Sequence, residues 1–287
     1  MSTFETKKNV TKSCCEPSCC SDGTISMKEL ESPEKIKQAV KEKYSNIARS
    51  SSTCCGDDSD LIKVNDNYEQ LKGYNKDADL QLGCGVPTEF AGIMEGNVVV
   101  DLGAGAGNDV FVSRALVGES GKVIGIDFSE EMLLKAFKNL SKTGFKNIDF
   151  KLGEIEDLPI EEKTADVVIS NCVLNLVPDK EEAFTEIYRI LKDNGHFCVS
   201  DIVVEGDMPE EIRKDASLYV GCISGAIQKN EYISIIEKVG FKNIEIKRSK
   251  TNTIPDEILD KHLDINEKDK LLNSGFGIYS ITVVGYK

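Results

Sequence analysis

From residue 97 onward, two patterns of hydrophobic residues alternate along the chain. Short apolar runs of strand length alternate with stretches whose apolar residues recur at three- and four-residue spacing, a pattern typical of amphipathic helices. The runs predict strands at 97–103, 121–127, 147–153, 165–171 and 195–203, with helices at 108–118, 129–144 and 180–195. This alternation predicts an α/β, doubly wound fold, in which a parallel sheet carries helices on both faces. Ligands of such folds bind outside the carboxyl ends of the strands.

The end of the chain has a different pattern. A helix is expected at 229–240 and a strand at 242–249, and an apolar strand at 279–287 closes the sequence. Only a polar helical insertion at 255–272 separates these two strands, so they are expected to form an antiparallel pair at an edge of the sheet.

The first 96 residues are less regular. Residues 1–31 are polar and rich in cysteine, without periodicity, and are expected to form a disordered tail. A helix is expected from Ser32, which suits an N-cap and precedes a proline at the first helical position. The sequence thus divides into a tail at 1–31, a cap of helix and loops at 32–96, and a main domain at 97–287.

Composition narrows the classes of function. The 287 residues carry a net charge of −14 and no long basic stretch, which argues against nucleic acid as a partner. No apolar run resembles a secretory signal or reaches the length of a membrane span, so a cytoplasmic protein without membrane contact is expected. The ten cysteines would then be reduced, and are expected to be ligands, redox pairs or core residues rather than disulfides. A structural zinc site in the tail is disfavoured, because the Cys15 and Cys19 spacing lacks a second pair of ligands.

A glycine-rich loop, "DLGAGAGND" at 101–109, begins where the first expected strand ends. Its glycines allow the backbone to turn sharply and to approach a ligand closely, although the loop fits a dinucleotide fingerprint imperfectly. Asp101 would be awkward beside a pyrophosphate, but it suits a ligand that carries an amine and a sulfonium. Asp127 ends the second strand, where a carboxylate can accept hydrogen bonds from both hydroxyls of a ribose.

With these residues the chain resembles the class I S-adenosylmethionine-dependent methyltransferases over about residues 90–287. The resemblance implies a Rossmann-like, mostly parallel seven-stranded sheet whose last strand is antiparallel, and S-adenosylmethionine as the cofactor. It makes 97–287 the methyltransferase domain, with a substrate-site segment toward its C-terminal end. The residues that it places around the cofactor are Asp101, Gly103, Ala104 and Gly105 at the methionine portion, Asp127 at the ribose, Phe128, Glu154 and Ile155 near the adenine, and Asn171 at the methionine end.

The cysteines beyond residue 55 fall into two groups. Cys198 lies inside an expected strand and is expected to be a core residue. Cys84 lies between glycines in "LGCGVP", Cys172 follows the carboxyl end of the fourth strand, and Cys222 follows a glycine in "YVGCISGA". These three cysteines could converge above the cofactor.

A thiol-lined site favours a thiophilic substrate. Oxygen and nitrogen nucleophiles usually need a general base, most often His, and the two histidines, His196 and His262, lie outside the expected site loops. Trivalent arsenic needs no base, because its lone pair carries no proton. Three thiolates would hold it and leave that lone pair free to point at a methyl group.

The chain is similar, more specifically, to the bacterial arsenite S-adenosylmethionine methyltransferases over about residues 36–245. The segments that carry the similarity are "GDDSD", "LGCGVP", "DLGAGAGND", "IGIDFSEEML", "LGEIEDLP", "CISGA" and, most specifically, "SNCVLNLVPDK". The resemblance implies that Cys172 and Cys222 bind As(III), that Cys84 joins them, and that Cys54 or Cys55 takes part. It also implies that paired cysteines return methylated arsenic to the trivalent state, with thioredoxin or glutathione as the reductant of the resulting disulfide.

The expected function is therefore methyl transfer from S-adenosylmethionine to arsenite, or to a thiol conjugate of As(III), bound by cysteine thiolates, which detoxifies arsenic. Two alternatives are open. One is a methyltransferase for a small carbon acid or a quinol, and the other is a non-enzymatic protein that binds metals or metalloids through its thiols. The cysteine pairs of "SCCEPSCC" at 13–20 are expected to gather arsenic for the site.

Overall fold

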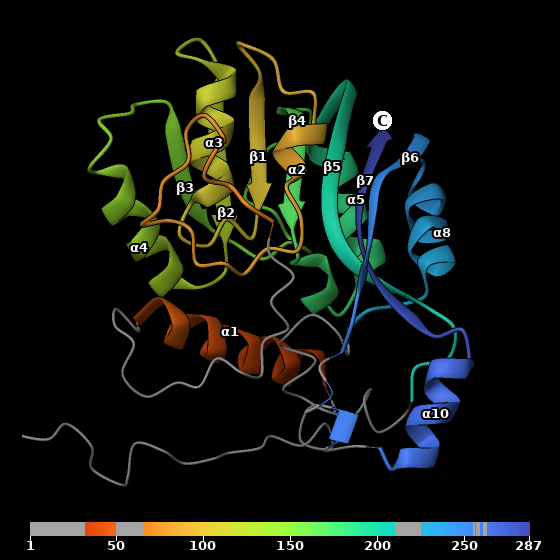
Figure 1. The fold of residues 1–287 in the computed structure, drawn as a ribbon. Helices are drawn as coiled ribbons and strands as arrows, with labels where there is room; N and C mark the ends of the chain where they lie inside the picture. Colours follow the sequence, from red (N-terminus) through yellow and green to blue (C-terminus); the bar gives the residue numbers. More distant parts are fainter. Residues whose placement is uncertain (1–31, 50–65, 210–224, 255, 257–258, 261–262) are drawn as a thin grey trace, which may run out of the picture.

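The computed structural model describes residues 32–49, 66–209, 225–254, 256, 259–260 and 263–287 (Figure 1). The cysteine-rich tail at 1–31 lies outside these residues, and so do three expected site residues, Cys54, Cys55 and Cys222. None of the helices within the described ranges combines the length and the apolar character that crossing a membrane requires.

A seven-stranded β-sheet forms the centre of the molecule, in the order β3-β2-β1-β4-β5-β7-β6. Its strands are β1 (Val98–Leu102), β2 (Lys122–Asp127), β3 (Ile148–Leu152), β4 (Ala165–Asn171), β5 (Leu191–Glu205), β6 (Lys242–Asn252) and β7 (Gly277–Tyr286). The first five strands are parallel, and β7 runs antiparallel to both β5 and β6. The predicted fold class is therefore confirmed, including the antiparallel pair at the edge.

Helices cover both faces of this sheet (Figure 1). The helices found in the described ranges are α1 (Pro33–Arg49), α2 (Pro87–Phe90), α3 (Asn108–Val117), α4 (Glu130–Leu140), the short η4 turn (Leu174–Leu176), α5 (Lys180–Ile190), α8 (Lys229–Val239) and α10 (Ile265–Asn273). α3 and α4 pack on one face, and α5 and α8 on the other. Adjacent residues of a strand pack into hydrophobic cores on opposite faces of the sheet: Val99 belongs to the core beside α3 and Val100 to the core beside α5. Burial on both faces explains the nearly continuous apolar runs of the central strands.

The boundary between α5 and β5 differs from the prediction. The helix ends at Ile190 instead of residue 195, and Leu191 already has extended backbone angles and pairs with β4. Asn194 then adopts a left-handed conformation, with φ 70°, before pairing with β4 resumes at His196. The predicted helix was too long because Asn and Gly favour a turn over a helix, whatever the apolar spacing before them.

Helix α1 crosses the carboxyl ends of the parallel strands (Figure 1). It packs on α4, where the Ser45 hydroxyl lies 3.0 Å from the Ser129 hydroxyl and donates to Glu131 at 2.7 Å. Ser129 is the N-cap of α4 and accepts a hydrogen bond from the N–H of Met132. These contacts tie α1 to the start of α4 and place it over the edge of the sheet where ligands of this fold class bind.

Candidate active site

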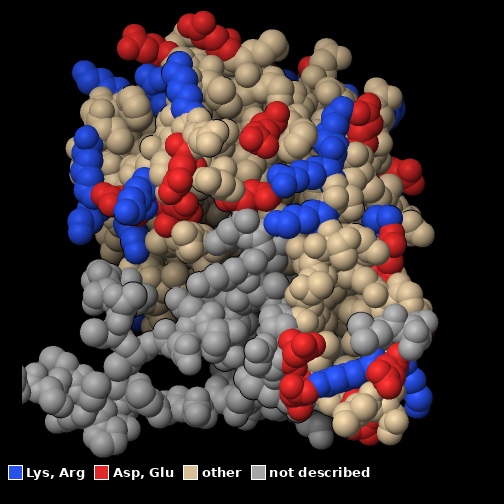
Figure 2. Space-filling view, in the orientation of Figure 1, with Lys and Arg blue, Asp and Glu red and all other residues tan. Residues whose placement is uncertain are grey.

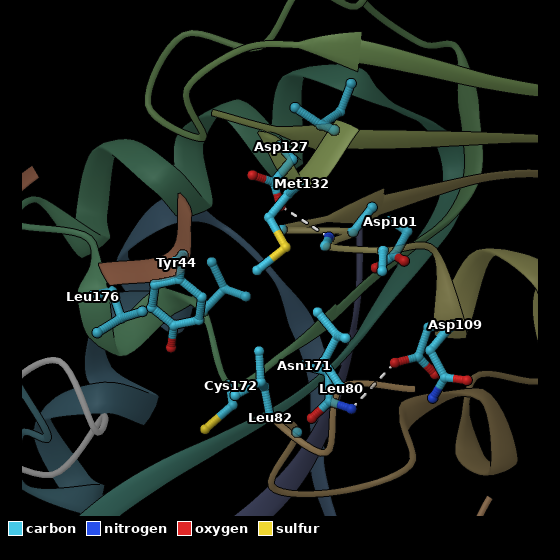
Figure 3. Close-up of a pocket in the computed structure, with 18 of the residues that line it drawn as sticks. Tyr44, Leu80, Leu82, Asp101, Asp109, Asp127, Met132, Asn171, Cys172 and Leu176 are labelled. Atoms are coloured by element: carbon cyan, nitrogen blue, oxygen red, sulfur yellow. Dashed lines mark hydrogen bonds between the residues drawn. The ribbon is translucent and has the colours of Figure 1, made fainter. Parts of the chain in front are cut away.

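A cavity of about 530 Å³ opens at the carboxyl ends of β1, β2 and β4. Its walls are the glycine loop, the residues at the ends of β2, β3 and β4, several residues between 66 and 83, and one side of α1. Figure 3 shows Asp127 and Met132 at one end of the view and Cys172 with Leu82 at the other, so the residues predicted around the cofactor share one cavity with Cys172. Cys84 is not among the described residues that line this cavity. The volume is within the range of pockets that enclose a small molecule.

The glycine loop depends on the conformational freedom of its residues. Gly103 and Gly105 have φ values of 69° and 53°, in the left-handed region that favours glycine. A Cβ at position 103 would overlap Val173, whereas nothing lies within 4 Å of the place that a Cβ would take at 105. The N–H of Gly105 donates to Asp127 Oδ2 at 2.9 Å. The loop therefore leaves open space beside a carboxylate that it holds in place.

Asp127 ends β2 and accepts hydrogen bonds from two backbone N–H groups. Its Oδ1 accepts from Ser129 and its Oδ2 from Gly105, each at 2.9 Å. A carboxylate oxygen can accept more than one hydrogen bond, so both oxygens keep capacity for the hydroxyls of a ribose. Burial raises the pKa of Asp127 to about 6, against the opposing effect of the N–H donors. The group is ionised at neutral pH, which is the form that accepts hydrogen bonds.

Asp101, near the carboxyl end of β1, lines the same cavity together with Ala104. Its side chain is buried, and its Oδ2 has no hydrogen-bond partner within the described part of the chain. Burial, together with the nearby Asp109 and Asp127, raises the pKa of Asp101 well above its usual range. An unpartnered carboxyl oxygen in a buried site is unfavourable, and a cationic ligand would relieve this. The amine and sulfonium of S-adenosylmethionine carry such charge, so the residues present fit this cofactor.

Asn171, the last residue of β4, belongs to a polar network beside the cavity. Its Nδ2 donates toward Tyr68 Oη at 2.8 Å, Gly85 O at 2.9 Å and Asp109 Oδ2 at 3.1 Å. Its Oδ1 accepts from the N–H of Cys84 at 3.0 Å. Burial raises the pKa of Asp109 to about 6, although the hydrogen bonds from Asn171 and Tyr68 lower it. The network fixes the loop that carries Cys84 against the end of β4.

The residues expected near adenine, Phe128, Glu154 and Ile155, all line the cavity. Lys37 of α1 also reaches this wall, with Nζ 2.5 Å from Glu154 Oε2 and 3.1 Å from Glu156 Oε1. Among the described lining residues, Lys37 is the one basic side chain. The wall is otherwise acidic or neutral, which favours a ligand with positive charge.

The structure brings Cys84 and Cys172 together at the carboxyl end of β4. Both are buried, and their sulfur atoms lie within 4.8 Å of each other and of a carboxyl oxygen of Asp201. Cys172 has a φ of 61°, and its N–H donates to Ser200 O at 2.7 Å. A residue with a side chain is uncommon in this left-handed region, and such strain concentrates at functional sites.

The two glycines that flank Cys84 allow this approach. A Cβ at Gly83 would lie 2.6 Å from Asn171 Nδ2, and a Cβ at Gly85 would lie 2.5 Å from Ser200 Oγ. Both distances are too short for a real side chain, so only glycine lets the loop lie this close to the end of β4 and to Ser200 within β5. The sequence "GCG" therefore positions the thiol between these two strands.

Cys198 and His196 lie apart from this cluster. Cys198 is buried in β5, where its Sγ donates to Pro87 O at 3.2 Å, and burial raises the pKa of its thiol. His196 donates from Nε2 to Ala91 O at 2.6 Å. Neither belongs to the cavity wall, so Cys198 occupies the core and His196 supplies no base to the site.

Three residues near the site were missed by sequence reasoning: Tyr68, Asp109 and Asp201. Asp201 had a usable signal, because it is an acidic residue inside the apolar run "HFCVSDIV" that forms most of β5. Acidic residues are seldom fully buried unless they are paired or have a role. Tyr68 lies in an irregular stretch in which no periodicity singles it out.

Comparisons with known proteins agree with this geometry. A family model described as a methyltransferase domain matches residues 93–265. The arsenite methyltransferase of Halobacterium salinarum is 36% identical over 279 residues, which cover 91% of this chain and 70% of that protein. The arsenite methyltransferase of Homo sapiens is 37% identical over 185 residues, which cover 60% of this chain and 48% of that protein. The chain therefore spans about half the length of the human relative.

A solved structure leads to the same family. The crystal structure of CrArsM, an arsenic(III) S-adenosylmethionine methyltransferase from Chlamydomonas reinhardtii, matches with a TM-score of 0.61 at 36% identity. The match covers 71% of this chain and 67% of that one. The chain belongs to the arsenite methyltransferase family and is an S-adenosylmethionine-dependent methyltransferase.

Proposed function

We propose that this chain transfers the methyl group of S-adenosylmethionine to trivalent arsenic held by the thiolates of Cys84, Cys172 and Cys222. The proposal rests on the two buried sulfurs of Cys84 and Cys172, which lie within 4.8 Å of each other beside the cavity that holds Asp101 and Asp127. Soft thiolates at this spacing suit one soft, thiophilic atom. Cys222 is assigned from the family resemblance, since it lies outside the described residues.

The cavity residues have separate tasks in this reaction. Asp127 accepts hydrogen bonds from the ribose hydroxyls and Asp101 faces the amine, which together orient a bound cofactor with its electrophilic methyl group. The thiolates hold arsenic through sulfur and leave its lone pair unshared. That lone pair forms the new As–C bond, while the C–S bond breaks and its electrons stay on the sulfur of the leaving thioether.

The transfer changes the oxidation state of arsenic. Because the lone pair becomes a bond to carbon, As(III) becomes formally As(V), and a return to As(III) takes two electrons. A pair of cysteines supplies two electrons when it forms a disulfide. We assign this task to a pair that includes Cys54 or Cys55, and thioredoxin or glutathione would then reduce the disulfide.

The two alternative functions have less support. A methyltransferase for a carbon acid or a quinol would need a general base, and the cavity wall contains no histidine within the described ranges. A protein that only sequesters metals would have no use for two buried carboxyls, Asp101 and Asp127, at the ends of adjacent strands.

Cysteine substitutions test the proposal. Cys172→Ser is expected to abolish methylation of both inorganic arsenite and monomethylated As(III), because two thiolates are the minimum for either substrate and serine offers a hard oxygen. Cys84→Ser is expected to abolish methylation of arsenite but to spare the monomethylated substrate, in which one carbon already replaces one sulfur. The measurement is the rate of methyl transfer to each arsenical.

The matched control is Cys198→Ser, whose thiol lies in the core and outside the cavity wall. This variant is expected to methylate both arsenicals. Cofactor affinity is measured in parallel for every variant, so that a damaged cofactor site is not mistaken for a damaged thiolate site. A Cys172→Ser variant that methylates arsenite at the unsubstituted rate would refute the proposal.

A further inference from the structure

Asp201 has no task in the reaction proposed above, yet it lies directly against the two thiols. Sγ of Cys84, Sγ of Cys172 and a carboxyl oxygen of Asp201 all lie within 4.8 Å of one another. All three side chains are buried, and Asp201 has no exposed surface. No other group of this kind, with three or more potential metal ligands, occurs in the described part of the chain.

Three separate segments hold these ligands in place. Cys84 lies in the loop between Gly83 and Gly85, which lies close against the end of β4 and against Ser200 within β5. Cys172 follows β4, and Asp201 lies within β5, where its neighbour Ser200 accepts the hydrogen bond from the N–H of Cys172. The cluster is therefore built by the register of β4 on β5 and does not depend on one mobile loop.

Asp201 is oriented in the way that metal-binding carboxylates usually are. Its Oδ1 accepts from the N–H of Ile202 at 3.0 Å, and its Oδ2 accepts from the hydroxyl of Tyr232 at 3.2 Å. The backbone N–H of Asn175 also donates to this carboxylate. Such outer hydrogen bonds fix a ligand, and three donors leave one of the roughly four lone pairs of a carboxylate available. Burial raises the pKa of Asp201 to about 7, and the nearby ammonium of Lys180 acts in the opposite direction.

We propose that Cys84, Cys172 and Asp201 together bind a divalent cation of borderline softness, with Zn²⁺ as the type, in competition with trivalent arsenic. Arsenic is satisfied by sulfur, whereas zinc takes thiolate and carboxylate ligands together and commonly has three protein ligands and one open position. Tetrahedral coordination at usual bond lengths brings two thiolate sulfurs to about 3.8 Å apart. The sulfurs, now within 4.8 Å, need to move by at most about 1 Å.

The inference goes beyond the proposed function and has a regulatory consequence. A zinc ion in this cluster occupies two of the thiols that arsenic needs, so zinc is an inhibitor of arsenite methylation. Binding displaces the protons of both thiols to the solvent, and the site therefore strengthens as the pH rises. Asp201 distinguishes zinc from arsenic, because zinc gains a bond to the carboxylate whereas arsenic is bound by sulfur alone.

The experiment isolates this cluster in the full-length chain. Six cysteines outside it are replaced by serine, namely Cys14, Cys15, Cys19, Cys20, Cys54 and Cys55. This background is titrated with Zn²⁺ against a chromophoric chelator, in the absence of arsenic and cofactor. One zinc ion per chain is expected to bind. Asp201→Asn in the same background is expected to weaken zinc at least about tenfold, as loss of a ligand-sphere contact does at other sites.

Cobalt provides a second readout. Co²⁺ in place of Zn²⁺ is expected to give thiolate-to-metal charge-transfer absorption together with the visible bands of a tetrahedral ion. Asp201→Asn is expected to change the visible bands and to keep the charge transfer, whereas Cys84→Ser is expected to diminish the charge transfer. If Asp201 had only a structural role, Asp201→Asn would change neither the visible bands nor the charge-transfer band of the cobalt protein. Cys198→Ser is the matched control, and its affinity and spectrum are expected to equal those of the background.

Two results would overturn the inference: a background that binds no zinc at micromolar concentration, or equal zinc affinity with and without Asp201→Asn. Should the sixfold background fail to show a folded circular dichroism spectrum, Asp201→Asn is made in the chain that keeps all its cysteines. That variant is then expected to bind one zinc ion fewer than the unsubstituted chain. An unchanged number of zinc ions would also overturn the inference. Because no arsenic is present, failure of the zinc site and failure of the arsenite reaction are distinguishable.

Discussion

At the scale of single residues, three buried carboxyl groups shape the cofactor cavity. Asp101, Asp109 and Asp127 all line it, and burial raises the pKa of each. A cationic ligand and ionised carboxylates stabilise each other. Binding of S-adenosylmethionine is therefore expected to be coupled to loss of protons from this site.

The affinity for S-adenosylmethionine is expected to fall as the pH decreases through about 6. Asp127 has a pKa raised to about 6, so below that pH its carboxyl is protonated in the empty site and accepts the ribose hydroxyls poorly. Above that pH Asp127 is ionised and accepts the ribose hydroxyls fully. Asp127→Ala is expected to weaken binding at least about tenfold above neutral pH, because a lost charge-assisted hydrogen bond costs roughly 1.5–3 kcal/mol. Calorimetric titration across this pH range measures both effects.

Asp149→Ala is the matched control for this prediction. Asp149 is a half-buried residue of β3, the strand beside β2, and it is not part of the cavity wall. Its variant is expected to keep both the affinity and the pH profile of the natural chain. Normal cofactor affinity in Asp127→Ala would contradict the role assigned to Asp127.

At the scale of elements, α1 is tied both to the cavity wall and to the start of α4. Lys37 at its start pairs with Glu154 and Glu156, and Ser45 near its end bonds to Glu131. Its last residue, Arg49, precedes the segment that contains Cys54 and Cys55. These contacts hold α1 against one wall of the cavity, which Lys37, Val40 and Tyr44 line.

Lys37→Ala is expected to raise the KM for S-adenosylmethionine about two- to fivefold, since partly exposed ion pairs contribute about 1 kcal/mol or less. The effect is expected to shrink at high salt, which screens exposed charges. Lys41→Ala is the matched control, because Lys41 is an exposed residue of the same helix and lies outside the cavity wall. Equal KM values for the two variants would show that the α1 ion pairs have no part in cofactor binding.

At the scale of the whole molecule, the charge distribution suits a small-molecule substrate. The net charge is −14, and Figure 2 shows acidic and basic side chains interspersed on this face, with no continuous basic area among the coloured residues. Long-range attraction of an anion is therefore weak. Inorganic arsenite is a neutral species at physiological pH, so the negative net charge of the protein is not expected to repel it.

Deletion of residues 1–31 is expected to raise the KM for arsenite and to leave kcat unchanged, because the tail is proposed to gather arsenic and not to take part in methyl transfer. A sharper variant replaces only its four cysteines, Cys14, Cys15, Cys19 and Cys20, by serine and keeps the length of the chain. Both variants are expected to behave alike in steady-state kinetics at limiting and saturating arsenite. An unchanged KM in both would contradict a role for the tail.

Features that depend on local pattern were predictable from the amino-acid residues alone. The period of apolar residues located the strands and most helices, and the strand-end positions of Asp101 and Asp127 indicated the edge at which the cofactor is expected, because parallel strands bring their carboxyl ends together. The glycine loop was recognisable since positive φ values need glycine. The helix end at Ile190 was missed, and the division into a cap at 32–96 and a domain at 97–287 stays a prediction.

The way in which distant segments meet could not be predicted from local pattern. Cys84, Cys172 and Asp201 lie far apart in the sequence, and they converge because β4 and β5 pair in a register that sets Asn171 beside Ser200. The hydrogen bonds of Asn171 with Tyr68 and Asp109, and the contacts of α1 with the cavity, arise in the same way. Local periodicity states which face of an element is buried, but it does not state which side chain of another segment fills the space against it. That choice is made by close packing and by the pairing of buried polar groups.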